Sequence, residues 1–306
     1  KGNCARDQYG PIGDWDVSHI TDMGEIFGDT SSFNADISKW DVSSVTTMKS
    51  MFAGAIFFNG ELSKWDVSSV ITMASMFSGA TSFNCNISQW DMSSVTTVNA
   101  MFAGSTSFNG DISKWDVSGE MDMISMFNGA RSFNSDISTW DVTSVNSISA
   151  VFADTTSFNA DISKWDVSKV TTMASVFNHA VYFNDAISKW DVSSVITVNA
   201  MFAGATSFNG DISKWDVSSV IDMNAMFWHA SAFNCDLSKW DVSKVTIMTS
   251  MFSGARSFTQ RLCRSPWVNS KANKNDMFKG SYGSMCTATF SSRVALRRAV
   301  GECLKL

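Results

Sequence analysis

The chain repeats one pattern of apolar and polar positions every 25 residues. Tryptophan marks the period, because ten tryptophans are spaced by 25 residues and an eleventh follows after 27. They are Trp15, Trp40, Trp65, Trp90, Trp115, Trp140, Trp165, Trp190, Trp215, Trp240 and Trp267. Phenylalanine, isoleucine, valine and methionine recur at fixed distances from most of them. A fixed period of this length indicates a repeat architecture rather than two ordinary globular domains in 306 residues.

The apolar spacing changes within each unit, which predicts two kinds of element. Ile37, Trp40 and Val42 lie in a segment rich in β-forming and turn residues, where we expect a short strand and a corner. Between residues 45 and 55 the apolar positions follow the i, i+3, i+4, i+7 rule, which predicts a helical turn. Residues 41–44 supply suitable N-cap side chains ahead of it. Each unit is thus predicted to form one coil of strand, corner, helical turn and return.

A coil of 25 residues has too small a core to fold alone, so the units are expected to stack and share their stability. We expect an N-terminal cap or link over 1–14, a repeat solenoid of about ten coils over 15–260, a degraded final repeat or cap over 261–290, and a basic helix over 291–306. The side chains expected to form the core of the repeats include Trp40, Trp65, Trp90, Phe52, Phe77 and Phe102.

The unit resembles a known family of surface proteins. Its consensus, F-N-x-D-I-S-x-W-D-V-S-x-V-T-x-M-x-x-M-F-x-x-A, is similar to the leucine-rich-repeat-like units of BspA-type surface proteins, of mycoplasma surface lipoproteins and of diatom and other microalgal proteins. The resemblance covers about residues 9–258. It implies an α/β, right-handed solenoid of the leucine-rich-repeat type on or outside the cell, and it supplies no catalytic residues. By the same resemblance, Cys263 and Cys286 in the C-terminal cap are expected to form a disulfide.

The two ends also resemble microalgal members, but in inverted order. There, a helix of the form A-L-x-x-A-V-x-x-C-L precedes a cysteine-containing link and a Y-G-x-I-x-x-W-D-V-S start. Here the helix motif lies at 295–304 and the start motif at 4–18. This order suggests a segment of a longer tandem protein, or a subunit that joins head to tail. The residues expected to serve such assembly are Cys4, Cys303, Arg293, Arg297 and Arg298.

Charge is divided unevenly along the chain. Residues 261–306 contain nine Lys or Arg against two acidic residues, a balance of +7. Because the net charge is −6, the remaining residues 1–260 carry −13. An acidic body argues against nucleic acid as its partner. Opposite charges allow the tail of one molecule to attract the body of another, although a solvated basic cap without a partner is an equal alternative.

Aspartate follows tryptophan in all ten regular repeats, so stacking would align a column of carboxylates. Their first interpretation is capping of the predicted helical turn. A second is calcium binding, because carboxylate oxygens suit Ca²⁺. The calcium candidates are Asp41, Asp66, Asp91, Asp116 and Asp141. Lysines two positions before most of these aspartates offer counter-charge without a metal, and we therefore expect neither a metal nor another cofactor.

The remaining cysteines and one sequon give weaker indications. Cys85 and Cys235 share a repeat position but lie six coils apart, about 29 Å at strand spacing, so they cannot pair. They are either free buried thiols or exposed thiols bonded to another chain. Cys4 and Cys303 would lie at opposite ends of a rod about 50 Å long, so they could meet only between subunits. Asn86 opens the N-glycosylation sequon found in the chain.

Nothing in the sequence predicts an enzyme. His19, His179 and His229 have no spacing suited to a shared zinc ion, and we find no phosphate loop or nucleophile elbow. No apolar run has the roughly 18 residues of a membrane helix. The leading hypothesis is an extracellular structural protein that associates with itself into a filament, sheath or surface coat. The alternative is a cell-surface adhesion or receptor ectodomain that binds a protein or glycan, for which the deviant segment 119–122 is the candidate patch.

Overall fold

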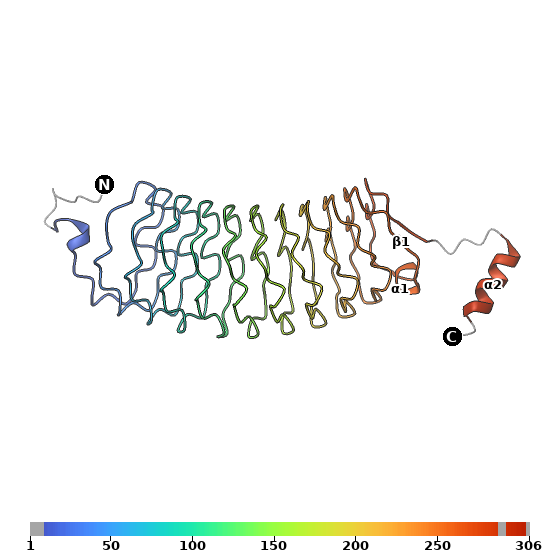
Figure 1. The fold of residues 1–306 in the computed structure, drawn as a ribbon, viewed down its shortest axis with the longest axis horizontal. Coiled ribbons are helices and arrows are strands. Elements are labelled where there is room, and N and C mark those ends of the chain that lie inside the picture. Colours follow the sequence, from blue (N-terminus) through green and yellow to red (C-terminus); the bar gives the residue numbers. More distant parts are fainter. Residues whose placement is uncertain (1–8, 287–291, 304–306) are drawn as a thin grey trace.

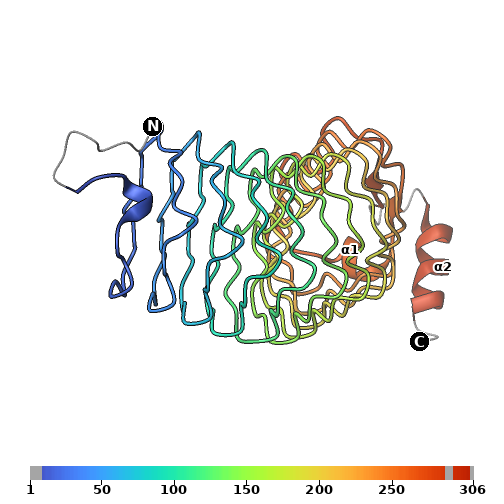
Figure 2. The ribbon, with the colours of Figure 1, turned by 60° about the vertical axis from the view of Figure 1, so that its left-hand side comes forward.

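The computed structural model describes residues 9–286 and 292–303 of the chain. The repeats form successive coils stacked into an elongated body, with the two chain termini at opposite ends (Figure 1). Seen obliquely, the N-terminal coils lie side by side, and the C-terminal coils overlap in the view (Figure 2). The tandem repeats therefore build a solenoid. Its handedness and its leucine-rich-repeat character stay predictions.

Regular secondary structure is confined to the ends of the stack. A 3-10 helix, η1, spans Ile12–Asp14 before the first coil. In the final coil β1 (Arg261–Leu262) pairs in parallel with β2 (Ser284–Met285), and α1 spans Ser265–Val268. The C-terminal helix α2 spans Arg293–Cys303. None of the helices in the described part of the chain has the length and apolarity that crossing a bilayer requires.

Neighbouring coils are joined by a backbone ladder that uses every second amide. In the second coil the N–H groups of Met48, Ser50 and Phe52 donate to carbonyls of the next coil at 3.0, 2.8 and 2.8 Å. The intervening amide of Met51 turns inward and donates to the Met48 carbonyl at 3.1 Å. The same residues thus close tight turns within a coil and bond the coils to each other, which satisfies the backbone without long strands.

The predicted helical turn over 45–55 is wrong. An α-helix requires N–H donation to the carbonyl four residues earlier and negative φ throughout. Here most of the amides bond to residue i−3 or to a neighbouring coil, none of them bonds to residue i−4, and Ser50 and Gly54 adopt φ values of 54° and 71°. The i, i+3, i+4, i+7 spacing is nevertheless real, because Met48, Met51 and Phe52 all point into the core. A chain of turns reproduced the apolar spacing of a helix.

The predicted strand at Ile37–Val42 is also wrong. That segment forms turns, in which the Trp40 amide donates to the Ile37 carbonyl at 3.1 Å. The parallel bridges between coils occur instead about seven residues after each regular tryptophan. Their column consists of Asp22, Thr47, Thr72, Thr97 and Asp122, followed by Ser147, Thr172, Thr197, Asp222, Ile247 and Asn273.

Stacked aromatic rings fill the interior. Within one coil the rings of Phe52 and Phe58 lie 4.0 Å apart, and each stacks on its counterpart in the next coil, Phe77 at 5.5 Å and Phe83 at 6.2 Å. The buried tryptophans also hydrogen-bond to the backbone: Trp140 Nε1 donates to a carbonyl of the preceding coil at 3.1 Å, and its ring stacks on Trp165 at 6.4 Å. The six side chains expected in the core, Trp40, Trp65, Trp90, Phe52, Phe77 and Phe102, are all buried.

Candidate functional site: the two ends of the stack

The aspartate column on the side of the rod is engaged in local turns. Asp116 Oδ1 accepts hydrogen bonds from the Ser118 amide at 3.0 Å and the Ser118 hydroxyl at 2.6 Å. Asp41, Asp66 and Asp141 make the same pair of bonds to the residue two positions later, and Asp91 accepts from the amide of Ser93. Across residues 9–286 and 292–303, no three His, Cys, Asp or Glu side chains gather in a group that could hold a metal. The column therefore closes corners of the coil, not helix N-termini as expected.

These hydrogen bonds predict a defined acid sensitivity. The hydroxyl and amide of Ser118 hold the pKa of Asp116 below its usual value, and equivalent bonds do so for Asp91 and Asp141. A lowered folded-state pKa contributes stability above the unfolded pKa of about 3.9, and that stability is lost as the pH falls through the folded values. We therefore expect the melting temperature to fall as the pH is lowered from 5 to 2.

A triple variant, Asp91→Asn, Asp116→Asn and Asp141→Asn, tests this cause, because asparagine keeps an acceptor oxygen but does not titrate. The melting temperature of the variant should fall less between pH 5 and pH 2 than that of the unaltered chain, as followed by circular dichroism. An equal or steeper fall would show that the hydrogen-bonded carboxylates are not the source of the acid sensitivity.

A second column, of asparagines, links the coils at another corner. The amide of Asn59 donates to Asn34 Oδ1 at 3.0 Å, and Asn134 donates in the same way to Asn109 at 2.8 Å. The side chain of each asparagine thus satisfies the backbone of the following coil. Asn86, the sequon residue, is exposed and accepts a bond from the Ser88 amide at 3.0 Å. Its glycosylation stays a prediction.

In the deviant segment 119–122 both the core residue and the hydrogen-bond register are shifted by one position. A valine expected at position 120 is replaced by Glu120, which is exposed, and Met121 fills the core instead with 4% of its surface exposed. The ladder shifts by one residue, because Asp122 rather than Met121 donates to the Thr96 carbonyl. Among the described residues, no bridge joins Asp122 to Ser147. Met121 thus takes the place of the missing valine in the core, and the role of this segment as a binding patch stays a prediction.

Two histidines replace glycine at a tight turn on the rim. His179 and His229 adopt φ values of 53° and 54° at the position where most other coils carry glycine with φ near 70° and two carry aspartate, Asp29 and Asp154. His179 Nδ1 lies 3.4 Å from Asp154 Oδ1, and its ring meets Trp228 edge-on at 6.4 Å. Both imidazoles lie over the glycine of the following coil. This cluster was not anticipated from the sequence, where the two histidines were considered only as zinc ligands.

The cysteines fall into three groups. Cys263 and Cys286 form a disulfide with a Cα–Cα distance of 4.7 Å, which ties the final coil together. Cys85 is a buried free thiol and Cys235 a half-buried one, and burial raises the pKa of both. Cys4 lies outside the described residues. Cys303 is the last residue of α2. The proposed link between these last two stays a prediction.

The first coil presents a row of unpaired backbone acceptors. In later coils the carbonyls at the corresponding positions accept bonds from the preceding coil, as Thr47 and Lys49 do from the first coil at 3.0 Å each. No described coil precedes the first one, so within the described structure its row of carbonyls accepts no hydrogen bond. The row consists of Asp22, Gly24, Ile26 and Gly28.

The last coil presents the matching row of donors. Carbonyls of this coil, including those of Asn273 and Met277, accept bonds from the preceding coil at 2.8 Å. The alternate amides of the same segment would continue the ladder, but within the described structure they donate to nothing. These amides belong to Lys274, Asp276, Phe278 and Gly280. The two ends are thus complementary in both hydrogen-bond polarity and spacing.

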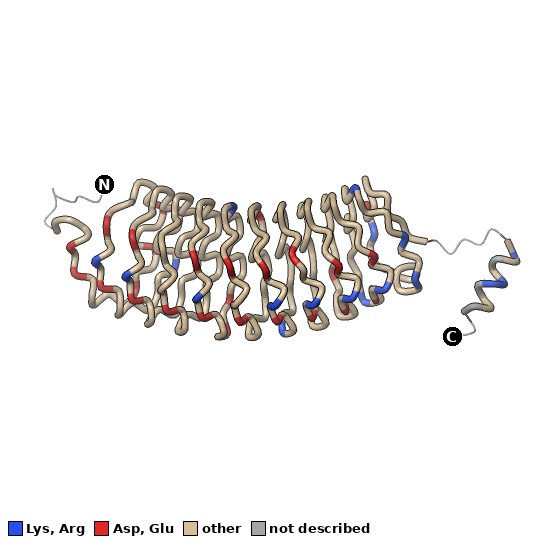
Figure 3. Tube along the Cα trace, viewed as in Figure 1, with Lys and Arg blue, Asp and Glu red and all other residues tan. Residues whose placement is uncertain are grey.

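Charge is opposite at the two ends. Residues 9–38 contain six acidic residues and no Lys or Arg, whereas residues 261–286 contain five Lys or Arg and one Asp. The separation is visible along the rod, with acidic residues at the N-terminal end and basic residues gathering toward the C-terminal end (Figure 3). Charges of opposite sign attract over about 10 Å at moderate ionic strength.

A cleft opens on the face of the first coil. Its volume is about 670 Å³, and it is lined by Tyr9, Asp14, Trp15, Asp16, Val17 and Ile20. In inner coils the preceding coil covers the equivalent side chains: Trp40 is 6% exposed, against 37% for Trp15, and Val45 is fully buried, against 44% for Ile20. The cleft is therefore an uncovered stacking surface, lined by four apolar or aromatic side chains and two aspartates.

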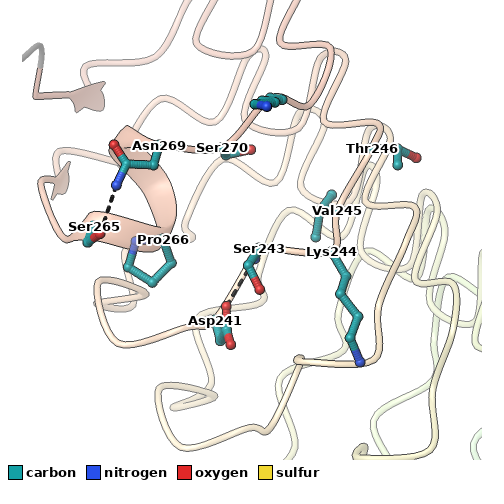
Figure 4. A pocket seen from close by; sticks show the side chains of 10 residues that line it. Asp241, Ser243, Lys244, Val245, Thr246, Ser265, Pro266, Asn269 and Ser270 are labelled. Carbon is teal, nitrogen blue, oxygen red and sulfur yellow. Dashed lines mark hydrogen bonds between the residues drawn. The ribbon is translucent and has the colours of Figure 1, made fainter.

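A pocket of similar volume at the other end has a different character. It lies where α1 departs from the regular corner, and its lining from α1 and the preceding coil is mostly polar but includes Val245 and Pro266 (Figure 4). Within it Asn269 bonds to Ser265 at 2.9 Å, while Lys244 and Lys271 add positive charge.

Comparison with known proteins matches one family profile, and a solved structure aligns only weakly. The family profile described as "Mycoplasma protein of unknown function, DUF285" matches in three overlapping stretches, residues 2–106, 81–190 and 173–287. No curated protein matches the chain. A solved structure entitled "Crystal structure of TLR13-ssRNA13 complex" aligns with 11% identity and a TM-score of 0.27. That alignment covers 75% of this chain and 36% of the TLR13 chain.

Proposed function

The chain belongs to the family described as "Mycoplasma protein of unknown function, DUF285", and from its two ends we propose that it is a structural protein whose copies join head to tail into a filament, sheath or coat. The observation that carries the proposal is the pair of complementary backbone rows, four acceptors on the first coil and four donors on the last. An open β-like edge of this kind readily pairs with another chain. The acidic first coil and the basic last coil favour that pairing in one orientation only.

Assembly can be tested by placing a charge on the acceptor row. Ile26 is 45% exposed in the first coil, and its carbonyl belongs to the row. In Ile26→Arg, a long cation would stand against the basic last coil of the next copy, so we expect association to weaken at least tenfold while the fold is kept. Sedimentation velocity of the full chain over a range of concentrations measures this change.

The matched control is Ile71→Arg, which places the same charge on an isoleucine that is 51% exposed in the middle of the rod. It should associate like the unaltered chain. If the unaltered chain stays monomeric at every concentration, the proposal of head-to-tail assembly is wrong. It is also wrong if Ile26→Arg associates as strongly as the control Ile71→Arg.

The location of this assembly is part of the proposal. We infer that it lies outside the cell or on its surface, and we retain the BspA-type, leucine-rich-repeat interpretation with a microalgal style of repeat. The disulfide between Cys263 and Cys286 supports an oxidising compartment, because such bonds are rare in reducing cytosol.

An adhesion or receptor ectodomain is the second candidate. It is favoured by exposed isoleucines on three successive coils, Ile196 and Ile221 at one repeat position and Ile247 at the next, each at least 39% exposed. The first two are directly stacked, because the Ile221 amide donates to the Ile196 carbonyl at 2.8 Å. Exposed apolar residues grouped in this way are typical of a protein-binding surface.

A further inference from the structure

The helix α2 carries an apolar face that the solenoid does not cover. Leu296 and Val300 are spaced by four residues and are 45% and 48% exposed. With 3.6 residues per turn, they lie on one side of the helix together with Arg293 and Arg297. The described part of α2 therefore presents a stripe that is apolar and flanked by positive charge.

The cleft on the first coil has the complementary character. Tyr9, Trp15 and Ile20 give it exposed apolar walls, and Asp14 and Asp16 give it negative charge. In the inner coils this surface is covered by packing, so its exposure on the first coil leaves apolar area in water. A basic amphipathic helix fits such a cleft in the manner of helix-in-groove recognition.

The cleft that α2 can fill belongs to another copy. Seven chain steps separate Cys286 from Arg293 and three helical steps follow to Leu296, so Leu296 reaches at most about 29 Å from the last coil. Ten bridge intervals lie between Asp22 and Asn273, and the missing bridge from 122 to 147 counts as one of them. At strand spacing they amount to about 48 Å. A helix tethered to the last coil cannot reach the first coil of its own chain.

We propose that α2 of one copy inserts Leu296 and Val300 into the Tyr9–Trp15–Ile20 cleft of the next copy, with Arg293 and Arg297 facing Asp14 and Asp16. This inference rests on the proposed head-to-tail assembly and names a second contact within it. The partner is therefore a second copy of this chain. In the inner stack a regular coil covers the tryptophan corner. At the junction α2 takes that place over residues 9–20 of the first coil, and the last coil pairs with the backbone row at 22–28.

A charge exchange between two full-length variants tests the contact. Arg297→Glu reverses a charge on the helix only, and Asp14→Lys reverses a charge in the cleft only. Each variant alone should therefore associate about tenfold more weakly than the unaltered chain. In an equimolar mixture, the new glutamate on the helix of the first variant meets the new lysine in the cleft of the second. The unaltered helix of the second variant likewise meets the unaltered cleft of the first. The mixture should therefore recover association, as measured by sedimentation velocity at low and high salt.

Mid-rod charge changes control for the exchange. Lys114→Glu and Glu120→Lys alter exposed residues of an inner coil, and their association should be unchanged. If Arg297→Glu associates like the unaltered chain while Ile26→Arg does not, assembly stands and the helix contact is wrong. If the single variants weaken association but the mixture does not recover it, the pairing of these charges is wrong. If the unaltered chain never associates, both proposals fall.

Discussion

Phe127→Ala is expected to cost about 4 kcal/mol of unfolding free energy and to divide the stack into two blocks. Phe127 is fully buried in the middle of the rod, where its ring stacks on Phe102 at 5.7 Å, on Phe152 at 6.0 Å and on Phe133 at 3.9 Å. Alanine would remove these contacts and leave a cavity that the rigid coils on either side cannot close.

The loss should appear as reduced cooperativity as well as reduced stability. In a solenoid each coil contacts only its neighbours, so a weak interface in the middle uncouples the coils on its two sides. Denaturant unfolding followed by tryptophan fluorescence should change from one transition to two, or show a lower slope. Ile124→Ala, in the same coil but 38% exposed, should stay within about 0.5 kcal/mol. A single transition of unchanged slope for Phe127→Ala would contradict nearest-neighbour coupling.

The sequence predicted the period, the stacking and the buried positions, because these follow from apolar spacing alone. It did not predict the local backbone. The spacing of Met48, Met51 and Phe52 suits a helix, but it equally suits successive turns whose alternate amides bond to the next coil. Deciding between them requires knowledge of Ser50, which adopts a φ of 54°. Serine carries no local signal for that conformation, and it is stabilised here by bonds to a neighbouring coil.

The candidate site was anticipated through charge and end motifs, but not through its geometry. The sequence indicated an acidic body and a basic tail, and it pointed to Arg293 and Arg297. It could not reveal that the first coil exposes the carbonyl of Ile26, or that Trp15 borders a cleft. These properties arise because the described stack ends there, and each repeat has the same sequence pattern whether or not another coil covers it.

Removal of the disulfide in Cys263→Ser/Cys286→Ser should destabilise the final coil by about 3 kcal/mol. The bond closes a segment with a sequence separation of 23, which contains α1, and it lies beside the short parallel pair of Leu262 and Met285. Two residue pairs of β-structure hold this coil weakly, so without the cross-link the segment should open before the rest of the stack unfolds.

Limited trypsin digestion measures this opening, because Lys271 and Lys274 lie inside the closed segment. The variant should be cut there at least tenfold faster than the unaltered chain, while the inner coils stay protected. Cys235→Ser, which removes a free and half-buried thiol from an inner coil, should leave the cutting rate unchanged. Because the donor row at 274–280 lies inside the same segment, the variant should also lose head-to-tail association. Faster cutting with intact association would show that the ladder of the last coil is not the assembling edge.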